Sequence, residues 1–254
     1  MVEVKVKAQS LHRGFSMQLS TFSVAASRPL PVFVLADTSG SMSGDKIAAL
    51  NLALREMLAE LGEVSDLRSA IEVSVITFGG SPIVVQPLAP PESISLPELE
   101  ASGKTLMGEA IDIVRSMLED ESIVPTRAFL PTIVLISDGI PTGLPKDIRA
   151  KAKSGIAERT DFMDWEPLKA LHSSPRAARA LRLAMGIGQD ARYEMLSAFV
   201  NTAGVPVIRG DEAASISKFL RWVTLSVASR TLSRAPDAPL LADLDVFSDQ
   251  ELMI

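Results

Sequence analysis

Short runs of apolar residues recur along this chain, separated by longer segments in which apolar residues return every three to four positions. The runs are bounded by polar or turn-forming residues and are rich in valine, isoleucine and leucine, which is typical of buried strands. We therefore predict strands over residues 31–36, 71–78, 83–88, 131–138, 181–185 and 205–208.

The segments between these runs predict helices. After Ser43 the apolar side chains fall on one face of a helix, at Ile47, Leu50, Leu54, Met57, Leu58 and Leu61. Similar patterns predict a helix ending near Glu119, one through 195–200 and one through 216–227. The polar region 146–180 is expected to be partly helical, with Trp165 and Leu168 packing inward.

Strands that alternate with helices indicate an α/β fold with a doubly wound, mostly parallel sheet and helices on both faces, similar to the Rossmann arrangement. We predict six strands. Residues 83–88 follow residues 71–78 after the turn Gly79–Pro82, which indicates a hairpin. Pro82 and Pro87 fit a strand at the sheet edge, so one antiparallel edge strand is expected.

The chain has 254 residues and is 47% hydrophobic, enough for one large domain with a buried core. We place this domain at residues 28–230. Residues 1–27 form an N-terminal extension that begins with alternating valine and charged residues, and residues 231–254 form an acidic, proline-containing C-terminal tail.

Composition excludes several kinds of site and partner. Cysteine is absent, so disulfides and thiolate chemistry are excluded. The formal net charge is −6 and no block of lysine or arginine stands out, which argues against nucleic-acid binding. No apolar run is long enough to span a membrane, and the N-terminus has no apolar signal core, so we expect a cytoplasmic protein.

Candidate chemistry lies at the ends of two predicted strands. Asp37, Ser39 and Ser41 follow the first strand, and Asp138 ends the fourth. Thr105 lies in a loop that opens another helix. Parallel strands bring their carboxyl ends to one crevice, where these oxygen groups suit Mg²⁺ or Mn²⁺ better than zinc or copper. Each segment alone could be an ordinary helix cap or turn, but three in this order favour a metal site.

These five positions resemble the metal-ion-dependent adhesion site of the von Willebrand factor A domain family, written Asp-x-Ser-x-Ser, then Thr, then Asp. The resemblance extends over about residues 28–230. The sequences Asp-Thr-Ser-Gly-Ser-Met-Ser-Gly (37–44) and Ser-Asp-Gly-Ile-Pro-Thr-Gly (137–143) look more narrowly like those of TerY-type bacterial members, which are associated with tellurium resistance and chemical stress.

The resemblance implies roles for the five residues. Ser39 and Ser41 would bind the metal directly and Thr105 directly or through water, while Asp37 and Asp138 would mainly hold waters and orient hydroxyls. Neutral hydroxyls leave the ion poorly neutralised, so it would accept an Asp or Glu side chain from a partner protein. The implied function is a non-enzymatic scaffold, with a Ser/Thr kinase and a PP2C-type phosphatase as candidate partners.

An alternative function is metal-dependent phosphotransfer through Asp37, although the Asp-x-Asp pattern of such phosphatases is absent.

Two sequence patterns that resemble nucleotide-binding motifs are incomplete or misplaced. Gly103-Lys-Thr105 lacks the first glycine of a phosphate-binding loop, and residues 186–191 match a dinucleotide fingerprint on the fifth strand, where a structural turn is the simpler interpretation.

Other polar residues receive simpler expectations. Lys104, beside Thr105, is expected to point outward, and His12 and His172 are expected at the surface. The C-terminal acids could reach the metal of the same or a neighbouring molecule, although a solvated tail is the simpler interpretation; they are Asp243, Asp245, Asp249 and Glu251.

Overall fold

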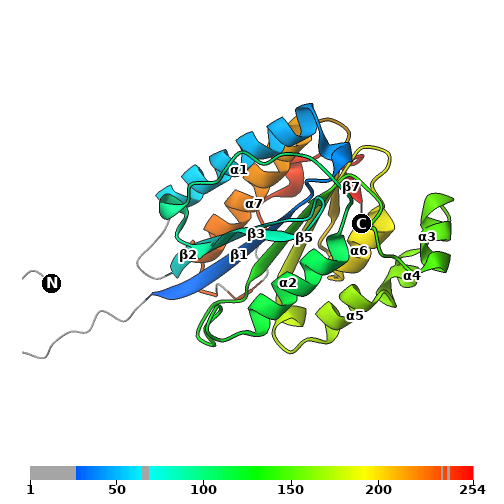
Figure 1. The fold of residues 1–254 in the computed structure, drawn as a ribbon. Coiled ribbons are helices and arrows are strands. Elements are labelled where there is room, and N and C mark those ends of the chain that lie inside the picture. Colours follow the sequence, from blue (N-terminus) through cyan, green and yellow to red (C-terminus); the bar gives the residue numbers. More distant parts are fainter. Residues whose placement is uncertain (1–26, 65–68, 236, 239–240, 254) are drawn as a thin grey trace, which may run out of the picture.

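The computed structural model describes residues 27–64, 69–235, 237–238 and 241–253. A seven-stranded sheet forms the centre, with strand order β3-β2-β1-β4-β5-β6-β7 (Figure 1). The strands are β1 (Arg28–Ala36), β2 (Ser69–Thr77), β3 (Ile83–Ala89), β4 (Thr132–Ser137), β5 (Leu181–Ile187), β6 (Val207–Gly210) and β7 (Leu252–Met253).

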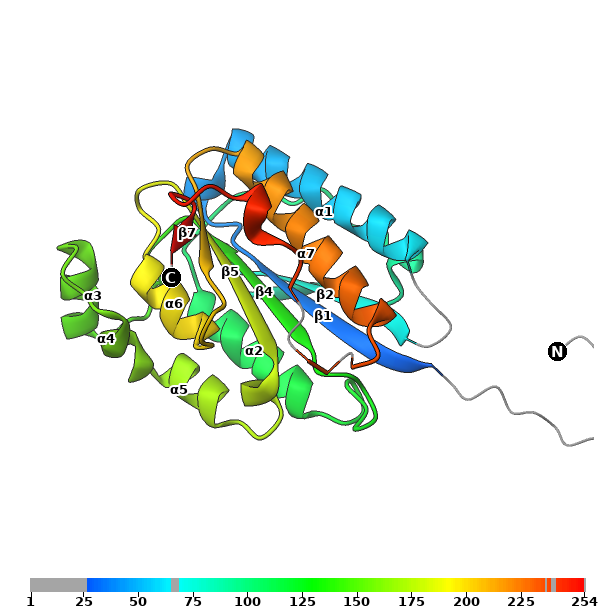
Figure 2. The ribbon, with the colours of Figure 1, turned by 180° about the vertical axis from the view of Figure 1, so that it is seen from behind.

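Helices cover both faces of the sheet, as predicted. One face carries α1 (Asp45–Glu63) and α7 (Ala214–Leu232), which lie side by side in both views (Figures 1 and 2). The other face carries α2 (Met107–Glu119), α3 (Lys146–Lys153), α4 (Arg159–Met163), α5 (Glu166–Ser173) and α6 (Tyr193–Val200). Four 3₁₀ turns complete the described structure: η1 (Gly40–Met42), η2 (Pro91–Ser93), η3 (Ala177–Arg179) and η4 (Leu244–Val246).

The central strands are apolar on both faces because both faces are covered by helices. In β1, Val32 and Val34 pack with α1 and α7, whereas Phe33 and Leu35 pack with α2. Alternate side chains of a strand point to opposite faces, so a strand between two helical layers needs apolar residues at every position. This requirement explains the continuous apolar runs in the sequence.

The sheet differs from the prediction in its strand count. Strands β2, β1, β4, β5 and β6 are mutually parallel, and β3 is antiparallel at one edge, as expected. The prediction of six strands with one antiparallel edge is corrected by β7, which pairs antiparallel with β6 at the opposite edge. A two-residue strand has no periodicity to detect, and it exists because its backbone meets Val207 and Ile208.

The interpretation of the C-terminus as a solvated tail is wrong for the segment 241–253, parts of which pack on α7. Trp222 Nε1 donates a hydrogen bond to Ala242 O at 3.1 Å, and the Phe247 ring packs edge-on against the Trp222 ring with centroids 5.7 Å apart. Glu251 accepts hydrogen bonds from Lys218 Nζ at 2.8 and 2.9 Å. The Glu251 carboxylate is therefore already engaged within its own domain.

Other expectations have mixed outcomes. Trp165 and Leu168 are buried, as predicted. The prediction of a surface position is wrong for His172, because both of its ring nitrogens are buried. Burial, followed by the charge of Arg182, lowers the pKa of His172.

The N-terminal extension, His12 included, lies outside the described residues apart from Ser27. Within the described part of the chain, no helix has the length and apolarity needed to cross a membrane.

Candidate metal centre

The three predicted segments meet at the carboxyl ends of the parallel strands. Strands β1 and β4 are neighbours in register, with Ala36 opposite Ile136, so Asp37 and Asp138 follow adjacent strands. The loop that carries Thr105 is bound to the same edge through its backbone: Ser102 N donates to Thr38 O at 2.7 Å, Gly40 N donates to Gly103 O at 3.1 Å, and Leu106 N donates to Phe78 O at 3.1 Å.

Asp37 is fully buried, and both of its carboxylate oxygens accept hydrogen bonds. Oδ1 accepts from the backbone N–H of Ser39 at 2.8 Å, and Oδ2 accepts from Ser137 Oγ at 2.6 Å. Desolvation raises the pKa of Asp37, the hydrogen bonds from Ser137 and Ser39 oppose this rise, and the charge of Asp138 adds to it. Asp37 thus fixes the turn that presents the two serines.

The serine hydroxyls of the first segment point toward the second aspartate. Ser39 Oγ and Ser41 Oγ are 3.1 Å apart, and Ser41 Oγ donates to Asp138 Oδ1 at 2.7 Å. Ser39 and Asp138 are buried, whereas Ser41 is exposed. The cluster therefore opens to solvent on the side of Ser41.

Thr105 completes the cluster from the third segment. It is buried, and its carbonyl accepts a hydrogen bond from Thr142 N at 2.8 Å, which joins its loop to the segment after β4. A Cβ atom at Gly139 would lie 3.5 Å from Thr105 Oγ1 and 3.9 Å from Ser41 Oγ. Both hydroxyls thus face the backbone of Gly139, and all five predicted residues lie together.

Lys46, in the first turn of α1, is a site residue that the sequence analysis missed. Its Nζ lies 2.5 Å from Asp138 Oδ2 and 3.4 Å from Ser41 O, and its side chain is about one third exposed. The sequence analysis singles out Lys104 instead, and Lys104 is exposed, as expected. The signal available in the sequence was the position of Lys46 at the start of the helix that follows the Asp-x-Ser-x-Ser loop. Helical side chains lean toward the N-terminus of the helix, so Lys46 can reach back to that loop.

The oxygen donors fit a hard divalent cation. Adjacent ligands of an octahedral Mg²⁺ at about 2.0–2.1 Å stand about 3 Å apart, which matches the 3.1 Å between the hydroxyls of Ser39 and Ser41. Within the described ranges no group of three or more His, Cys, Asp or Glu side chains could hold a metal ion. Any metal at this edge must therefore rely on hydroxyl groups together with Asp37 and Asp138.

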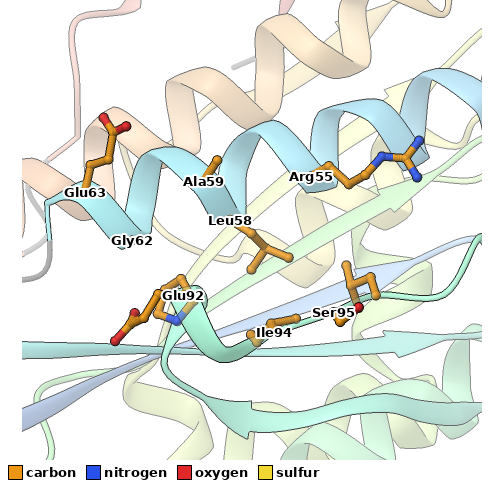
Figure 3. Close-up of a pocket in the computed structure, with 10 residues that line it drawn as sticks. Arg55, Leu58, Ala59, Gly62, Glu63, Glu92, Ile94 and Ser95 are labelled. Carbon is orange, nitrogen blue, oxygen red and sulfur yellow. The ribbon is translucent and has the colours of Figure 1, made fainter.

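Two other features of the chain do not belong to this cluster. A groove of about 510 Å³ runs beside α1, where Leu58 points toward the segment of Ile94 (Figure 3), and it contains none of the predicted site residues. The fingerprint-like turn at 186–191 has a packing role, because a Cβ atom at Gly186 would lie 2.8 Å from Tyr193 and 2.9 Å from Leu196. Gly186 thus lets α6 approach β5 closely.

Comparisons with known proteins concern the family and the fold. Residues 32–140 match the family model of the von Willebrand factor type A domain. Among curated proteins, no sequence matches this chain significantly.

Solved structures share the fold at low sequence identity. A von Willebrand factor type A protein from Catenulispora acidiphila aligns with a TM-score of 0.55 and 16% identity over 79% of this chain and 42% of its own. Proximal thread matrix protein 1 from the mussel byssus, with a zinc-occupied MIDAS motif, aligns with a TM-score of 0.56 and 16% identity over 80% and 48%.

The pilus adhesin SpaC from Lactobacillus rhamnosus GG aligns with a TM-score of 0.58 and 14% identity over 79% of this chain and 30% of that protein. The present chain thus spans less than half the length of each of these three relatives.

Proposed function

We propose that this chain, whose residues 32–140 match the model of the von Willebrand factor type A domain, belongs to that family and is a divalent-metal-dependent protein-binding module. The observation that carries the proposal is the meeting of three hydroxyl groups and two carboxylates from three distant segments at one edge of the sheet. The five residues are Asp37, Ser39, Ser41, Thr105 and Asp138.

The donor chemistry explains why such a site would bind a partner. Ser39, Ser41 and Thr105 would hold the metal through neutral oxygens, and Asp37 and Asp138 would keep those oxygens oriented. A bound Mg²⁺ or Mn²⁺ supplies a Lewis-acid position for an incoming carboxylate. Because Ser41 lies on the exposed side of the cluster, an Asp or Glu side chain of a partner protein can approach there.

The protein-binding function is better supported than phosphotransfer through Asp37. A phosphorylated aspartate needs a carboxylate oxygen that can attack a substrate in line. Both oxygens of Asp37 are already hydrogen-bonded within a buried turn. We therefore propose that the chain is not an enzyme.

The biological setting is a finer part of this proposal. The motif sequences at 37–44 and 137–143 support a TerY-type scaffold in a bacterial stress or tellurium-resistance system, with a Ser/Thr kinase and a PP2C-type phosphatase as partners. We propose a cytoplasmic location and a von Willebrand factor type A unit at residues 28–230, with an N-terminal extension and a C-terminal segment on either side.

A metal titration tests the site directly. Titrating Mn²⁺ and following its electron paramagnetic resonance signal should give one saturable site in the wild type, at least about tenfold weaker in Ser39→Ala. Ser43→Ala, an exposed serine of the same loop, is the matched control and should bind as the wild type does. Competition by Mg²⁺ and Zn²⁺ then identifies the preferred metal.

Partner chemistry is tested with paired peptides. A peptide with one glutamate should bind the metal-loaded protein, and its glutamine version and the EDTA-treated protein should not. Equal Mn²⁺ binding by the wild type and Ser39→Ala would end the proposal. Turnover of an aryl phosphate that is lost in Asp37→Asn would replace it with the phosphotransfer function.

A further inference from the structure

Arginine side chains line a cleft at the end of the sheet opposite the metal centre. Two adjacent cavities, of about 180 and 140 Å³, share Leu130, Arg179 and Asp237 as lining residues. The arginines that line one or both cavities are Arg28, Arg176, Arg179, Arg182 and Arg230.

The parallel topology gathers these residues from distant parts of the chain. Arg28 begins β1, Arg182 is the second residue of β5, and Arg230 lies in the last turn of α7. β1, β4 and β5 start at one end of the sheet, near the end of α7 (Figure 2). Arg28 and Asp37 are nine residues apart along an extended strand, which separates the cleft from the metal centre by about 30 Å.

Two of the arginines form a fixed, buried wall. Arg182 donates to Phe199 O at 2.8 Å and to Ala178 O at 3.0 Å, and Arg230 donates to Thr132 Oγ1 and Leu130 O, each at 2.6 Å. Burial lowers the pKa of both guanidinium groups to about 10, so they remain charged at neutral pH. The buried part of the cleft therefore carries the two positive charges of Arg182 and Arg230.

Two further arginines retain unused donors. Arg176 Nη1 is buried and has no hydrogen-bond partner among the described residues, although its Nη2 donates to Val124 O. Arg179 is exposed, and its side chain makes no hydrogen bond or ion pair within the described ranges. A buried donor without a partner is costly, so an acceptor from outside the chain would be stabilised here.

Asp237 is the only acidic residue among those that line the two cavities in the described structure. Its Oδ1 accepts from Leu130 N at 2.8 Å, and its Oδ2 lies 3.6 Å from Arg28 Nη2. Because both side chains are nearly half exposed, this ion pair contributes little stability. A single carboxylate against five guanidinium groups leaves the cleft strongly positive in a chain whose net charge is −6.

We propose that this cleft is a second ligand site, which binds a phosphate monoester. Guanidinium forks bind phosphate oxygens in a bidentate manner, and the near-double negative charge and several acceptors of a phosphate suit several arginines at once. Arg176 and Arg179 would contact the phosphate, while Arg182 and Arg230 supply the fixed positive wall. The phosphate can belong to a small molecule or to a phosphorylated side chain.

Calorimetric titration with inorganic phosphate, in EDTA and at constant ionic strength, tests this site independently of the metal centre. The wild type should show saturable binding, and Arg179→Ala should weaken it about tenfold because it removes a charge-assisted contact. Asp237→Asn should tighten binding, because it removes the competing negative charge and keeps an acceptor for Leu130 N. Arg149→Ala, an exposed arginine on α3 with no ion pair in the described ranges, is the matched control and should leave binding unchanged.

The opposite changes expected for Arg179→Ala and Asp237→Asn separate a phosphate site from a loss of folding, which circular dichroism melting checks in parallel. Absence of saturable binding by the wild type, or equal weakening in Arg179→Ala and Arg149→Ala, would overturn the inference. A phosphoserine peptide that binds more tightly than inorganic phosphate, with no binding of its unphosphorylated form, assigns the site to a protein partner. Equal affinity for the two phosphates assigns it to a small molecule.

Discussion

Single side chains at the candidate metal centre have separable roles. Asp37 stabilises the Asp-x-Ser-x-Ser turn, because its carboxylate oxygens accept hydrogen bonds from Ser39 N and Ser137 Oγ. Asp138 instead faces Ser41 and Lys46. Lys46 is the only lysine or arginine that forms an ion pair with either carboxylate in the described structure, and it shares Asp138 with any divalent ion that binds.

Lys46→Met should therefore tighten Mn²⁺ binding by about tenfold, or about 1.4 kcal/mol, because it removes a positive charge from the same carboxylate. Electron paramagnetic resonance titration measures the dissociation constant. Lys104→Met is the matched control, since Lys104 is exposed beside Thr105, and it should change the constant little. Weaker binding by Lys46→Met would show instead that Lys46 holds Asp138 in position.

Gly79 is a second residue with a specific constraint. A Cβ atom at this position would lie 1.9 Å from Thr38 O, and Gly79 N donates to Thr38 Oγ1 at 2.9 Å. The loops that follow β1 and β2 are therefore in close backbone contact at Thr38, which belongs to the Asp-x-Ser-x-Ser turn.

We expect Gly79→Ala to destabilise the fold by about 3 kcal/mol, since backbone atoms must move apart. Urea unfolding measures the change. The control is Gly62→Ala in α1, where the nearest atom would be 3.6 Å away, so this variant should be neutral or more stable by up to about 1 kcal/mol. Similar loss of stability in both variants would contradict the proposed contact.

At the scale of elements, the C-terminal segment is held to α7 by Glu251. Lys218 first, and then the backbone and hydroxyl of Ser248, lower the pKa of Glu251 to about 2 from its ordinary value of 4.5. A lowered pKa stabilises the fold above pH 4.5, and this contribution is lost as the pH falls toward 2. The gain is modest because the Lys218 side chain is 37% exposed and solvent screens the pair.

Glu251→Gln should accordingly lower stability by about 0.5–1 kcal/mol near neutral pH. The difference in melting temperature from the wild type should shrink as the pH falls below 4.5. Calorimetry across this pH range checks the trend. Asp249→Asn, at an exposed position of the same segment, is the control and should change stability near neutral pH by less than about 0.5 kcal/mol.

For the whole molecule, the C-terminal segment completes the core and the sheet. Phe247 is 6% exposed and covers Trp222, while β7 closes the edge beside β6. A segment that covers a buried tryptophan contributes to global stability, in contrast to a solvated tail.

Phe247→Ala should cost about 3 kcal/mol of unfolding free energy and shift tryptophan fluorescence toward longer wavelength. Val246→Ala, at a neighbouring side chain that is 48% exposed, is the control and should change stability by less than about 0.5 kcal/mol. Equal stability of the two variants would mean that residues 241–253 do not protect the core in solution.

The sequence by itself determined the alternation of strands and helices, the antiparallel hairpin edge and the grouping of Asp37, Ser39, Ser41, Thr105 and Asp138. These features follow from local periodicity and from the rule that parallel strands end at one edge. The sequence did not reveal β7, because its two residues become a strand only through pairing with β6. Nor did it reveal the ion pair of Lys46, which depends on the orientation of α1 relative to β4.

Only the tertiary structure decided where distant charges meet. Arg28 and Arg230 are far from each other and from the arginines at 176, 179 and 182 in the sequence, yet the common starting edge of β1, β4 and β5 brings all five to one cleft. Likewise, burial of His172 depends on how α5 packs rather than on its neighbours in sequence. Local patterns determine helices and strands because the residues that form each element are close together in the sequence. Contacts between elements depend on how these elements pack in space, which the order of residues does not give directly.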